Sequence, residues 1–268
     1  MKRDCFLDGV REYWRTTHAD YLKHVGTTFQ AGYLASGDAP DAATRSNVRL
    51  ANMAGITEGA FVLDAGCGVC GPALDIVRAI PLIRIAGVTI SPEQSTSAHG
   101  LIQAAGLERF IHVTVADYHR LPFDSAIFDI VCFYESAIYA YDVHTVFREA
   151  FRVLRPGGSL YIKDIFIKPV PLSRRGHAEV VEFDRTFACR TRAIAEFVRA
   201  IAEAGFGGIA ERDITPEIST THTRRAMFLS GDWRSGLTSF GKKHFRLYWE
   251  LPLFFGEIKA VRPAQPHP

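Results

Sequence analysis

The stretch that decides the fold of this chain reads Phe61-Val62-Leu63-Asp64-Ala65-Gly66-Cys67-Gly68-Val69-Cys70-Gly71-Pro72. A short run of strand-forming residues ends in an acid and a glycine-dense turn, and a helical pattern follows from Ala73. Gly66 and Gly68 permit positive φ and remove Cβ where a ligand must approach, and the helix start leaves N–H groups free. Such a turn serves any tight strand-to-helix connection, but the carboxylate of Asp64 beside it suits a ligand with ammonium or hydroxyl groups.

Strands and helices alternate after this turn, as a doubly wound and mainly parallel sheet requires. We expect strands over 84–89, 110–116, 128–134 and 159–165, with helices over 92–105 and 143–154. Ligands of such sheets bind beyond the C-terminal ends of the strands. Polar residues that follow the strands are Asp64, Thr89 to Gln94, Asp117, Tyr118, Glu135 and Ser136.

The segment from Leu63 to Gly71 resembles the first motif of the class I S-adenosylmethionine-dependent methyltransferases. The run Arg155-Pro156-Gly157-Gly158 before a strand is also common in that family. The resemblance implies an α/β, Rossmann-like fold with a mainly parallel seven-stranded sheet, and S-adenosyl-L-methionine as the cofactor. Cys70 departs from the glycine usual at its place and is tolerated if its side chain points away from the ligand.

The stretch Gly87-Val88-Thr89-Ile90-Ser91-Pro92-Glu93-Gln94 resembles a pattern of the cyclopropane, tocopherol and sterol methyltransferase branch. In that branch the glutamine contacts the ribose of the cofactor. The residues alone also fit a helix start, with Ser91 as N-cap and Gln94 at the reciprocal place of a capping box. Both roles stay open.

Cofactor contacts are predicted from these motifs and from the family. Related enzymes place a tyrosine like Tyr33 near the methionine carboxylate, and the acid at Asp117 can accept from the adenine amino group. We expect Gly66→Val to weaken cofactor binding much more than folding. The predicted cofactor-binding residues are Tyr33, Asp64, Gly66, Gly68, Thr89, Ser91, Gln94, Asp117 and Tyr118.

The segment Phe133-Tyr134-Glu135-Ser136-Ala137-Ile138-Tyr139 is similar to an N-E-S-x-x-Y motif of geranyl diphosphate C-methyltransferases and related sterol-type enzymes. Asp213-Ile214-Thr215-Pro216 resembles a second segment of that group. The resemblance implies methyl transfer to an alkene carbon of a small isoprenoid, such as a prenyl diphosphate of the isopentenyl or geranyl type. The resulting carbocation must lose a proton. Glu135 is the candidate base, with an acceptor role for backbone or cofactor groups as the alternative.

A basic segment completes the candidate substrate site. Between His222 and Glu250 there are six Lys and Arg residues and two acids, which fits either a solvated helix face or a site for a diphosphate. Mg²⁺ would accompany a diphosphate, and the metal requirement stays open. Aromatic faces can stabilise a carbocation. The predicted substrate-binding residues are Tyr139, His222, Arg224, Arg225, Tyr248 and Trp249.

With 268 residues, 47% of them hydrophobic, the chain is expected to form one domain. Its parts are lid helices over 1–55, a cofactor-binding core over 56–167, a cap with substrate-binding segments over 168–250, and a closing edge strand over 251–262. The absence of a signal-peptide core and an odd count of five cysteines predict a cytoplasmic protein.

The net charge of +2 argues against a nucleic-acid partner, no apolar run predicts a membrane span, and a homo-oligomer stays open. Two other functions remain. One is O- or N-methylation of a small secondary metabolite, and the other is a non-catalytic cofactor-binding subunit.

Overall fold

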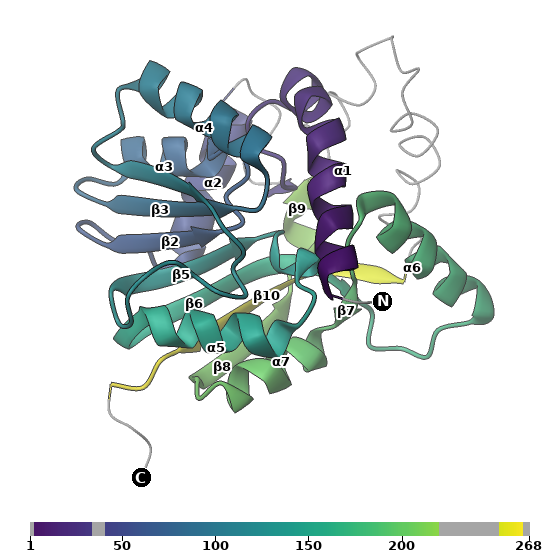
Figure 1. Cartoon of the computed structure of the whole chain (residues 1–268). Coiled ribbons are helices and arrows are strands. Elements are labelled where there is room, and N and C mark those ends of the chain that lie inside the picture. Colours follow the sequence, from purple (N-terminus) through teal and green to yellow (C-terminus); the bar gives the residue numbers. More distant parts are fainter. Residues whose placement is uncertain (1–2, 34–40, 220–251, 265–268) are drawn as a thin grey trace.

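The computed structural model describes residues 3–33, 41–219 and 252–264. Its centre is a twisted sheet with the strand order β4-β3-β2-β5-β6-β10-β8, to which the two-residue strand β7 is added beside β6 (Figure 1). The strands are β2 (Phe61–Ala65), β3 (Arg84–Thr89), β4 (Ile111–Val115), β5 (Phe128–Tyr134), β6 (Leu154–Ile167), β7 (Arg192–Ala193), β8 (Gly207–Asp213) and β10 (Leu253–Val261). Apart from β10, which is antiparallel to both of its neighbours, the described pairs within this sheet are parallel. The predicted mainly parallel sheet is confirmed, and β7 adds an eighth strand to the seven that were expected.

Both faces of the sheet are covered, because successive residues of a strand point to opposite sides. Val62 joins one hydrophobic core and Leu63, the next residue of β2, joins the other. One core lies beneath α2 (Ala42–Ala54), α3 (Gly71–Ala79) and α4 (Pro92–Ala105), and the other beneath α5 (Val143–Val153) and α7 (Ile194–Glu203). The strands therefore read as nearly continuous apolar runs, as strands buried on both faces do.

Two helices stand outside this three-layer arrangement. Figure 1 shows α1 (Arg3–His24) beside one end of the sheet, with α6 (Arg174–Phe187) beyond it. A second, two-stranded sheet pairs β1 (Gly32–Tyr33) with β9 (Ile218–Ser219). Two short 3₁₀ turns, η2 (Ala137–Tyr139) and η3 (Thr215–Glu217), follow β5 and β8. Within the described ranges, no helix combines the length and the apolar character needed to cross a membrane.

The structure changes the role predicted for three segments. The C-terminal strand β10 is not an edge strand, because it lies between β6 and β8 and pairs with both. The segment 168–250 is not a cap throughout, since its α7 and β8 complete a helical layer and the sheet. Of the two expected lid helices, α2 packs against α3, and α1 alone lies over the C-terminal ends of the strands.

Candidate active site

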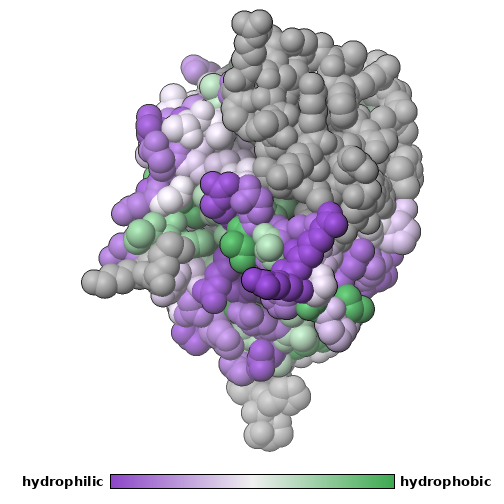
Figure 2. Space-filling model, turned by 90° about the vertical axis from the view of Figure 1, so that its right-hand side faces the viewer, coloured by the Kyte–Doolittle hydropathy of each residue, from purple (hydrophilic) through white to green (hydrophobic). Residues whose placement is uncertain are grey.

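A cavity lies where the central strands end and is bounded by α1, α6 and the segment of residues 25–33 that follows α1. Its sheet side consists of residues at or just after the ends of β2, β3, β4, β5 and β6. Seen from the side of α1 and α6, hydrophobic side chains gather near the middle of the described surface, between hydrophilic ones (Figure 2). Sequence reasoning placed the site at this edge of the sheet, and the structure agrees.

Asp64 ends the central strand β2 inside this cavity. Its side chain is buried, and its Oδ1 has no hydrogen-bond partner within the described structure. Burial raises the pKa of Asp64 to about 7. An unpartnered buried carboxylate is costly unless a ligand supplies a donor. The ammonium group of S-adenosylmethionine fits this requirement, so the cavity suits that cofactor here.

The two glycines of the turn have different roles. A Cβ on Gly68 would meet only ordinary contacts, 3.9 Å from Phe29 and 4.0 Å from Gln94, so its open face is part of the cavity. A Cβ on Gly66 would lie 2.4 Å from Cβ of Ser136, and the Gly66 N–H already donates to Val88 O at 2.8 Å. Gly66 also lines the cavity, so it serves both packing and the space for a ligand, and Gly66→Val should destabilise the fold as well as weaken cofactor binding.

The side chain of Cys70 is fully buried and lies outside the cavity wall. Its Sγ would be 3.2 Å from a Cβ on Gly87, in the interior beside β3. The thiol therefore points away from the cavity. This is the orientation for which a cysteine was expected to be tolerated in place of the usual glycine.

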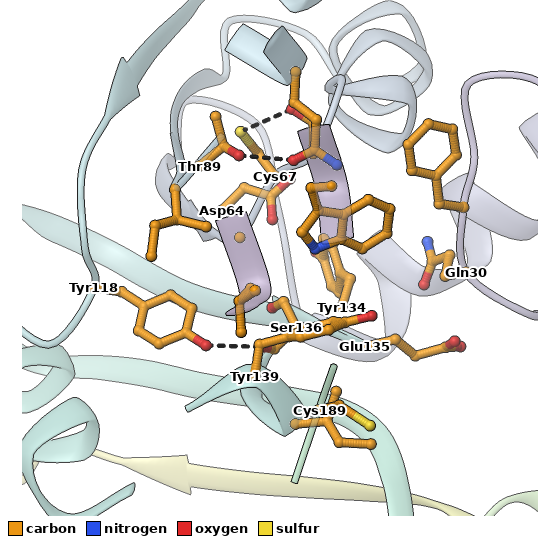
Figure 3. Close-up of a pocket in the computed structure, with 18 of the residues that line it drawn as sticks. Gln30, Asp64, Cys67, Thr89, Tyr118, Tyr134, Glu135, Ser136, Tyr139 and Cys189 are labelled. Atoms are coloured by element: carbon orange, nitrogen blue, oxygen red, sulfur yellow. Dashed lines mark hydrogen bonds between the residues drawn. The ribbon is translucent and has the colours of Figure 1, made fainter. Parts of the chain in front are cut away.

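At the end of β3, the predicted cofactor contacts Gln94 and Ser91 have different roles. Thr89 donates a 2.8 Å hydrogen bond from Oγ1 to Oε1 of Gln94, and both side chains line the cavity (Figure 3). Ser91 is buried outside the cavity wall, where its Oγ accepts from the Gln94 N–H at 3.2 Å and caps α4. Gln94 is thus held by two neighbours in a position to contact a ribose, whereas Ser91 is a helix cap and not a cofactor contact.

Asp117 and Tyr118 follow β4 and line the cavity, and Asp117 is the predicted contact of the adenine amino group. Asp117 accepts from Arg3 of α1 at 2.6 Å and from His119 Nδ1 at 2.5 Å, while Nε2 of His119 accepts the Tyr141 N–H at 3.1 Å. Burial alone would raise the pKa of Asp117, but the bonds from His119 and Arg3 lower it to about 2. Asp117 is therefore an anion that can accept from an amino group. The Tyr118 hydroxyl donates to Ser136 O at 3.0 Å, so its ring is the part that faces a ligand.

Tyr33 is not where the family comparison predicted. It is 1% exposed and lies outside the cavity wall, with its hydroxyl 3.3 Å from that of Tyr161 and the Arg49 guanidinium 4.6 Å from its ring centroid. Pairing of β1 with β9 fixes this direction. Tyr21 of α1 and Gln30 line the cavity instead.

Glu135 occupies a strained position after β5, with a φ of 55°. Its Oε1 forms an ion pair with Lys163, whose side chain is completely buried, and accepts the Ala31 N–H at 2.9 Å. Lys163 also donates to Ala31 O at 2.6 Å. Both backbone groups of Ala31 are therefore fastened by this ion pair, which we name the latch of the 25–33 segment. Glu135, the predicted base, is therefore already engaged by Lys163 and by the Ala31 N–H. No role for Lys163 was predicted from the sequence.

Asp164, the neighbour of Lys163 on β6, also lines the cavity and was missed. Burial raises the pKa of Asp164 to about 7, an effect that bonds from the Ile165 and Ile138 amides partly offset. The sequence could have pointed to both residues, because Lys163 and Asp164 are adjacent charges inside the apolar run 159–165. Buried charges in a central strand require partners or a function.

Aromatic rings form much of the remaining wall. Trp14 stacks on Phe29 with ring centroids 5.9 Å apart and an interplanar angle of 11°, and it packs against Tyr139 at 5.7 Å. In Figure 3, Tyr139 and Cys189 lie at the opposite end from Thr89 and Cys67, and we name this opposite region the acceptor end. The aromatic residues of the wall are Trp14, Tyr21, Phe29, Tyr118, Tyr134, Tyr139, Phe183 and Phe187.

The other predicted residues cannot be placed. His222, Arg224, Arg225, Tyr248 and Trp249 lie outside the described residues. Among the side chains that are described, no group of three or more His, Cys, Asp or Glu could hold a metal ion.

Comparison with known proteins agrees with this geometry. Residues 63–162 match the family described as a methyltransferase domain. The chain is 28% identical to 27-O-demethylrifamycin SV methyltransferase of Amycolatopsis mediterranei, over 85% of this chain and 80% of that protein. It is 34% identical to sterol 24-C-methyltransferase of Aspergillus fumigatus over 56% of this chain, but it spans only 40% of that protein.

Solved structures show the same fold. The [4+2]-cyclase SpnF has a TM-score of 0.78 and 20% identity, with 96% of each chain covered. Geranyl diphosphate C-methyltransferase from Streptomyces coelicolor A3(2) has a TM-score of 0.73 and 19% identity, with 96% of this chain and 98% of that chain covered. These matches show a methyltransferase domain over residues 63–162, and this domain contains the glycine turn, the unpartnered Asp64 and the Gln94 that lines the cavity.

Proposed function

We propose that the protein transfers a methyl group to an alkene carbon of a small isoprenoid, in particular a prenyl diphosphate. The observation that carries this proposal is the aromatic and acidic character of the acceptor end. Described side chains there include Trp14, Tyr139, Phe183 and Asp164, and the described cavity wall contains no Lys, Arg or His. Ring faces stabilise a carbocation without forming a bond to it, and an apolar wall excludes water from it.

Each part of the cavity has a role in this reaction. Asp64 would hold the ammonium group of the cofactor, Gln94 the ribose and Asp117 the adenine amino group. When bound, the cofactor supplies an electrophilic methyl group. Trp14 and Tyr139 would position the alkene and stabilise positive charge on it. The names of the sterol and geranyl diphosphate relatives support transfer to carbon.

The anionic end of a prenyl diphosphate needs cationic donors, which the described wall does not provide. We assign this role to the basic segment between His222 and Glu250, with Arg224 and Arg225 as the leading candidates and His222, Tyr248 and Trp249 beside them. A diphosphate would bring Mg²⁺ with it, held by the substrate.

Two alternatives have some support. The rifamycin relative acts on an oxygen atom by its name, so O-methylation is the second candidate, with a buried carboxylate as the base for a hydroxyl proton. The cyclase neighbour shows that this fold also serves a protein named for another reaction. Against a non-catalytic subunit stands the complete set of Asp64, Gln94 and Asp117 in one cavity.

The test uses purified protein, cofactor with a labelled methyl group, and either prenyl diphosphates or the matching alcohols. We expect labelled product from a diphosphate that becomes extractable into organic solvent after phosphatase treatment. Arg224→Gln should raise the KM for the diphosphate by about 10- to 100-fold, as for loss of a hydrogen bond to a charged group, and leave the alcohol unaffected. Arg225→Gln is the matched control, because we expect one of these neighbours to face the substrate. Label on the oxygen of an alcohol, with none on carbon, would contradict the proposal.

A further inference from the structure

Asp164 lies in the C-terminal half of β6 and lines the cavity beside Ile138 and Ile165, close enough to Cys189 of the acceptor end to interact with it electrostatically. Its Oδ1 accepts the Ile165 N–H at 2.9 Å, and its Oδ2 accepts the Ile138 N–H at 2.9 Å. A carboxylate has about four accepting positions. These two bonds therefore orient the carboxylate and leave accepting capacity on both oxygens.

We propose that Asp164, and not Glu135, is the base that removes the proton after methyl transfer. The charge of Glu135 is matched by the buried ammonium of Lys163, and its Oε1 is also bonded to the Ala31 N–H. Within the described residues, Asp164 takes part in no ion pair and is bonded to backbone amides alone. This inference rests on the proposed alkene methylation, because only a carbocation requires proton loss from carbon.

The step balances without any further reactant. The π electrons of the alkene form a bond to the methyl carbon, whose bond to sulfur breaks with both electrons staying on sulfur. The neighbouring alkene carbon is left positive. A C–H bond beside it then gives its electrons to a new π bond, and the proton passes to an oxygen of Asp164. Opening of the site returns this proton to solvent.

The surroundings of Asp164 suit reversible proton uptake. Burial is the main cause that raises its pKa to about 7, and the nearby charge of Glu135 adds to this while Lys163 opposes it. Tyr118 and Cys189 face it from the segments after β4 and α6, and burial raises the pKa of each well above its usual value, so both are neutral there. A base with a pKa near the working pH can both accept and release a proton.

The first experiment compares products of the wild type with those of Asp164→Asn. The variant should form the wild-type methylated alkene about 10²- to 10⁴-fold more slowly, the range for an acid–base group. Because C–C bond formation needs no base, S-adenosylhomocysteine should still appear, accompanied by other alkene isomers or an alcohol. In the wild type, the share of the normal alkene should increase as pH rises through about 7, where Asp164 ionises. Cofactor affinity, measured by calorimetry, should stay within about 3-fold of wild type.

Glu135→Gln is the matched control, because it changes the other carboxylate of the acceptor end. It should alter the binding and release of the cofactor through the latch while the product ratio stays that of the wild type. A second readout is carbon-13 NMR of labelled aspartate in the ligand-free protein. A carboxyl signal that titrates near pH 7 should be lost in Asp164→Asn and kept in Asp64→Asn.

If Asp164→Asn does not fold, the wild-type product ratio from pH 5.5 to 8.5, roughly 1.5 units to either side of the expected transition, still decides the matter. A constant ratio, or a wild-type rate and isomer pattern in Asp164→Asn, overturns the assignment while leaving alkene methylation intact. Loss of the normal product ratio in Glu135→Gln alone would return the role to Glu135. A wild type that methylates only hydroxyl or amine acceptors would overturn the proposed function and this inference together.

Discussion

Gly66 and Ser136 pack so closely that a Cβ on the glycine would lie 2.4 Å from the Cβ of the serine and 2.8 Å from its Oγ. The same serine hydroxyl donates to Ala65 O at 2.6 Å. This contact joins the turn after β2 to the turn after β5. The first turn forms one end of the cavity, and the second leads to the acceptor end. It makes Gly66 a packing requirement of the fold before the cofactor arrives.

The first prediction follows from this contact. Gly66→Ala and Gly59→Ala both place a side chain at positive φ, but a Cβ on Gly59 would meet nothing within 4 Å. Overpacking typically costs about 1–3 kcal/mol, so the free energy of unfolding should fall by that much more in Gly66→Ala than in Gly59→Ala. Denaturant unfolding monitored by circular dichroism measures both. Equal losses would mean that Ser136 moves aside without cost.

Gly68→Ala is predicted to behave in the opposite way. Its Cβ would project into the cavity between Phe29 and Gln94, where it meets no close contact in the protein. Stability should therefore match that of Gly59→Ala, while cofactor affinity falls, because the methyl group occupies space beside the backbone that the ligand needs. Calorimetric titration of both variants with S-adenosylmethionine provides the comparison. An unchanged affinity would place the cofactor elsewhere in the cavity.

The stability of the ligand-free protein should fall as pH rises from about 4 to about 7. The folded-state pKa of Asp64 is about 7, above the unfolded value near 4, so the folded state holds more protons in this window. Rising pH then favours the unfolded state, until the folded carboxyl has also ionised above pH 7. Asp164 contributes in the same direction. Asp64→Asn should reduce the slope, and chemical denaturation at a series of pH values would detect this.

Cofactor binding should show the reverse dependence on pH. An ammonium group beside Asp64 favours the ionised carboxylate, so affinity should increase as pH rises through about 7 and then level off. This dependence should be largely absent in Asp64→Asn, whose affinity should also be lower throughout. Isothermal titration in buffers of different ionisation enthalpy would report proton release by the wild type. If wild type and variant release protons equally, Asp64 does not face the ammonium group.

The ion pair of the latch predicts that substitutions of Lys163 and Glu135 have non-additive effects on stability. Lys163→Met leaves the carboxylate of Glu135 without its buried partner, and breaking one side of such a pair costs about 3–5 kcal/mol. Replacing both residues, as Lys163→Met with Glu135→Gln, should recover part of this loss. Stopped-flow measurement should also show faster cofactor release in either single variant, because the 25–33 segment is held less firmly. Strict additivity of the stability losses would show that the two side chains do not interact.

Local sequence patterns predicted the parts of the site that a single turn defines. Asp64 and Gln94 belong to short motifs in which backbone conformation and side-chain position are fixed together, and both line the cavity. Ser91 belongs to such a motif as well, but the pattern serves two purposes, and only the structure shows which one this residue takes. Motif position alone does not reveal which way a side chain points.

The missed residues depend on contacts between distant segments. Lys163 meets Glu135 and Ala31 through the pairing of β5 with β6 and the return of the 25–33 segment, which no local period encodes. Trp14 of α1 likewise packs on Phe29 and Tyr139, which come from other parts of the chain. The edge position predicted for β10 was wrong for the same reason. Strand composition does not specify which neighbours a strand will find.

The position of β10 imposes an order on folding. Phe254 of β10 pairs with Phe166 of β6, and Gly256 pairs with Asp213 of β8, so the strand joins two elements made well before it. During synthesis β8 must wait without its neighbour until β10 has been made, and its hydrogen-bonding edge stays exposed for that interval. Contacts between residues so far apart in sequence form slowly, and unpaired edges favour association with other chains. Synthesis of β10, more than formation of the cofactor site, would then set the moment at which the edge of β8 is covered and association with other chains through it ceases.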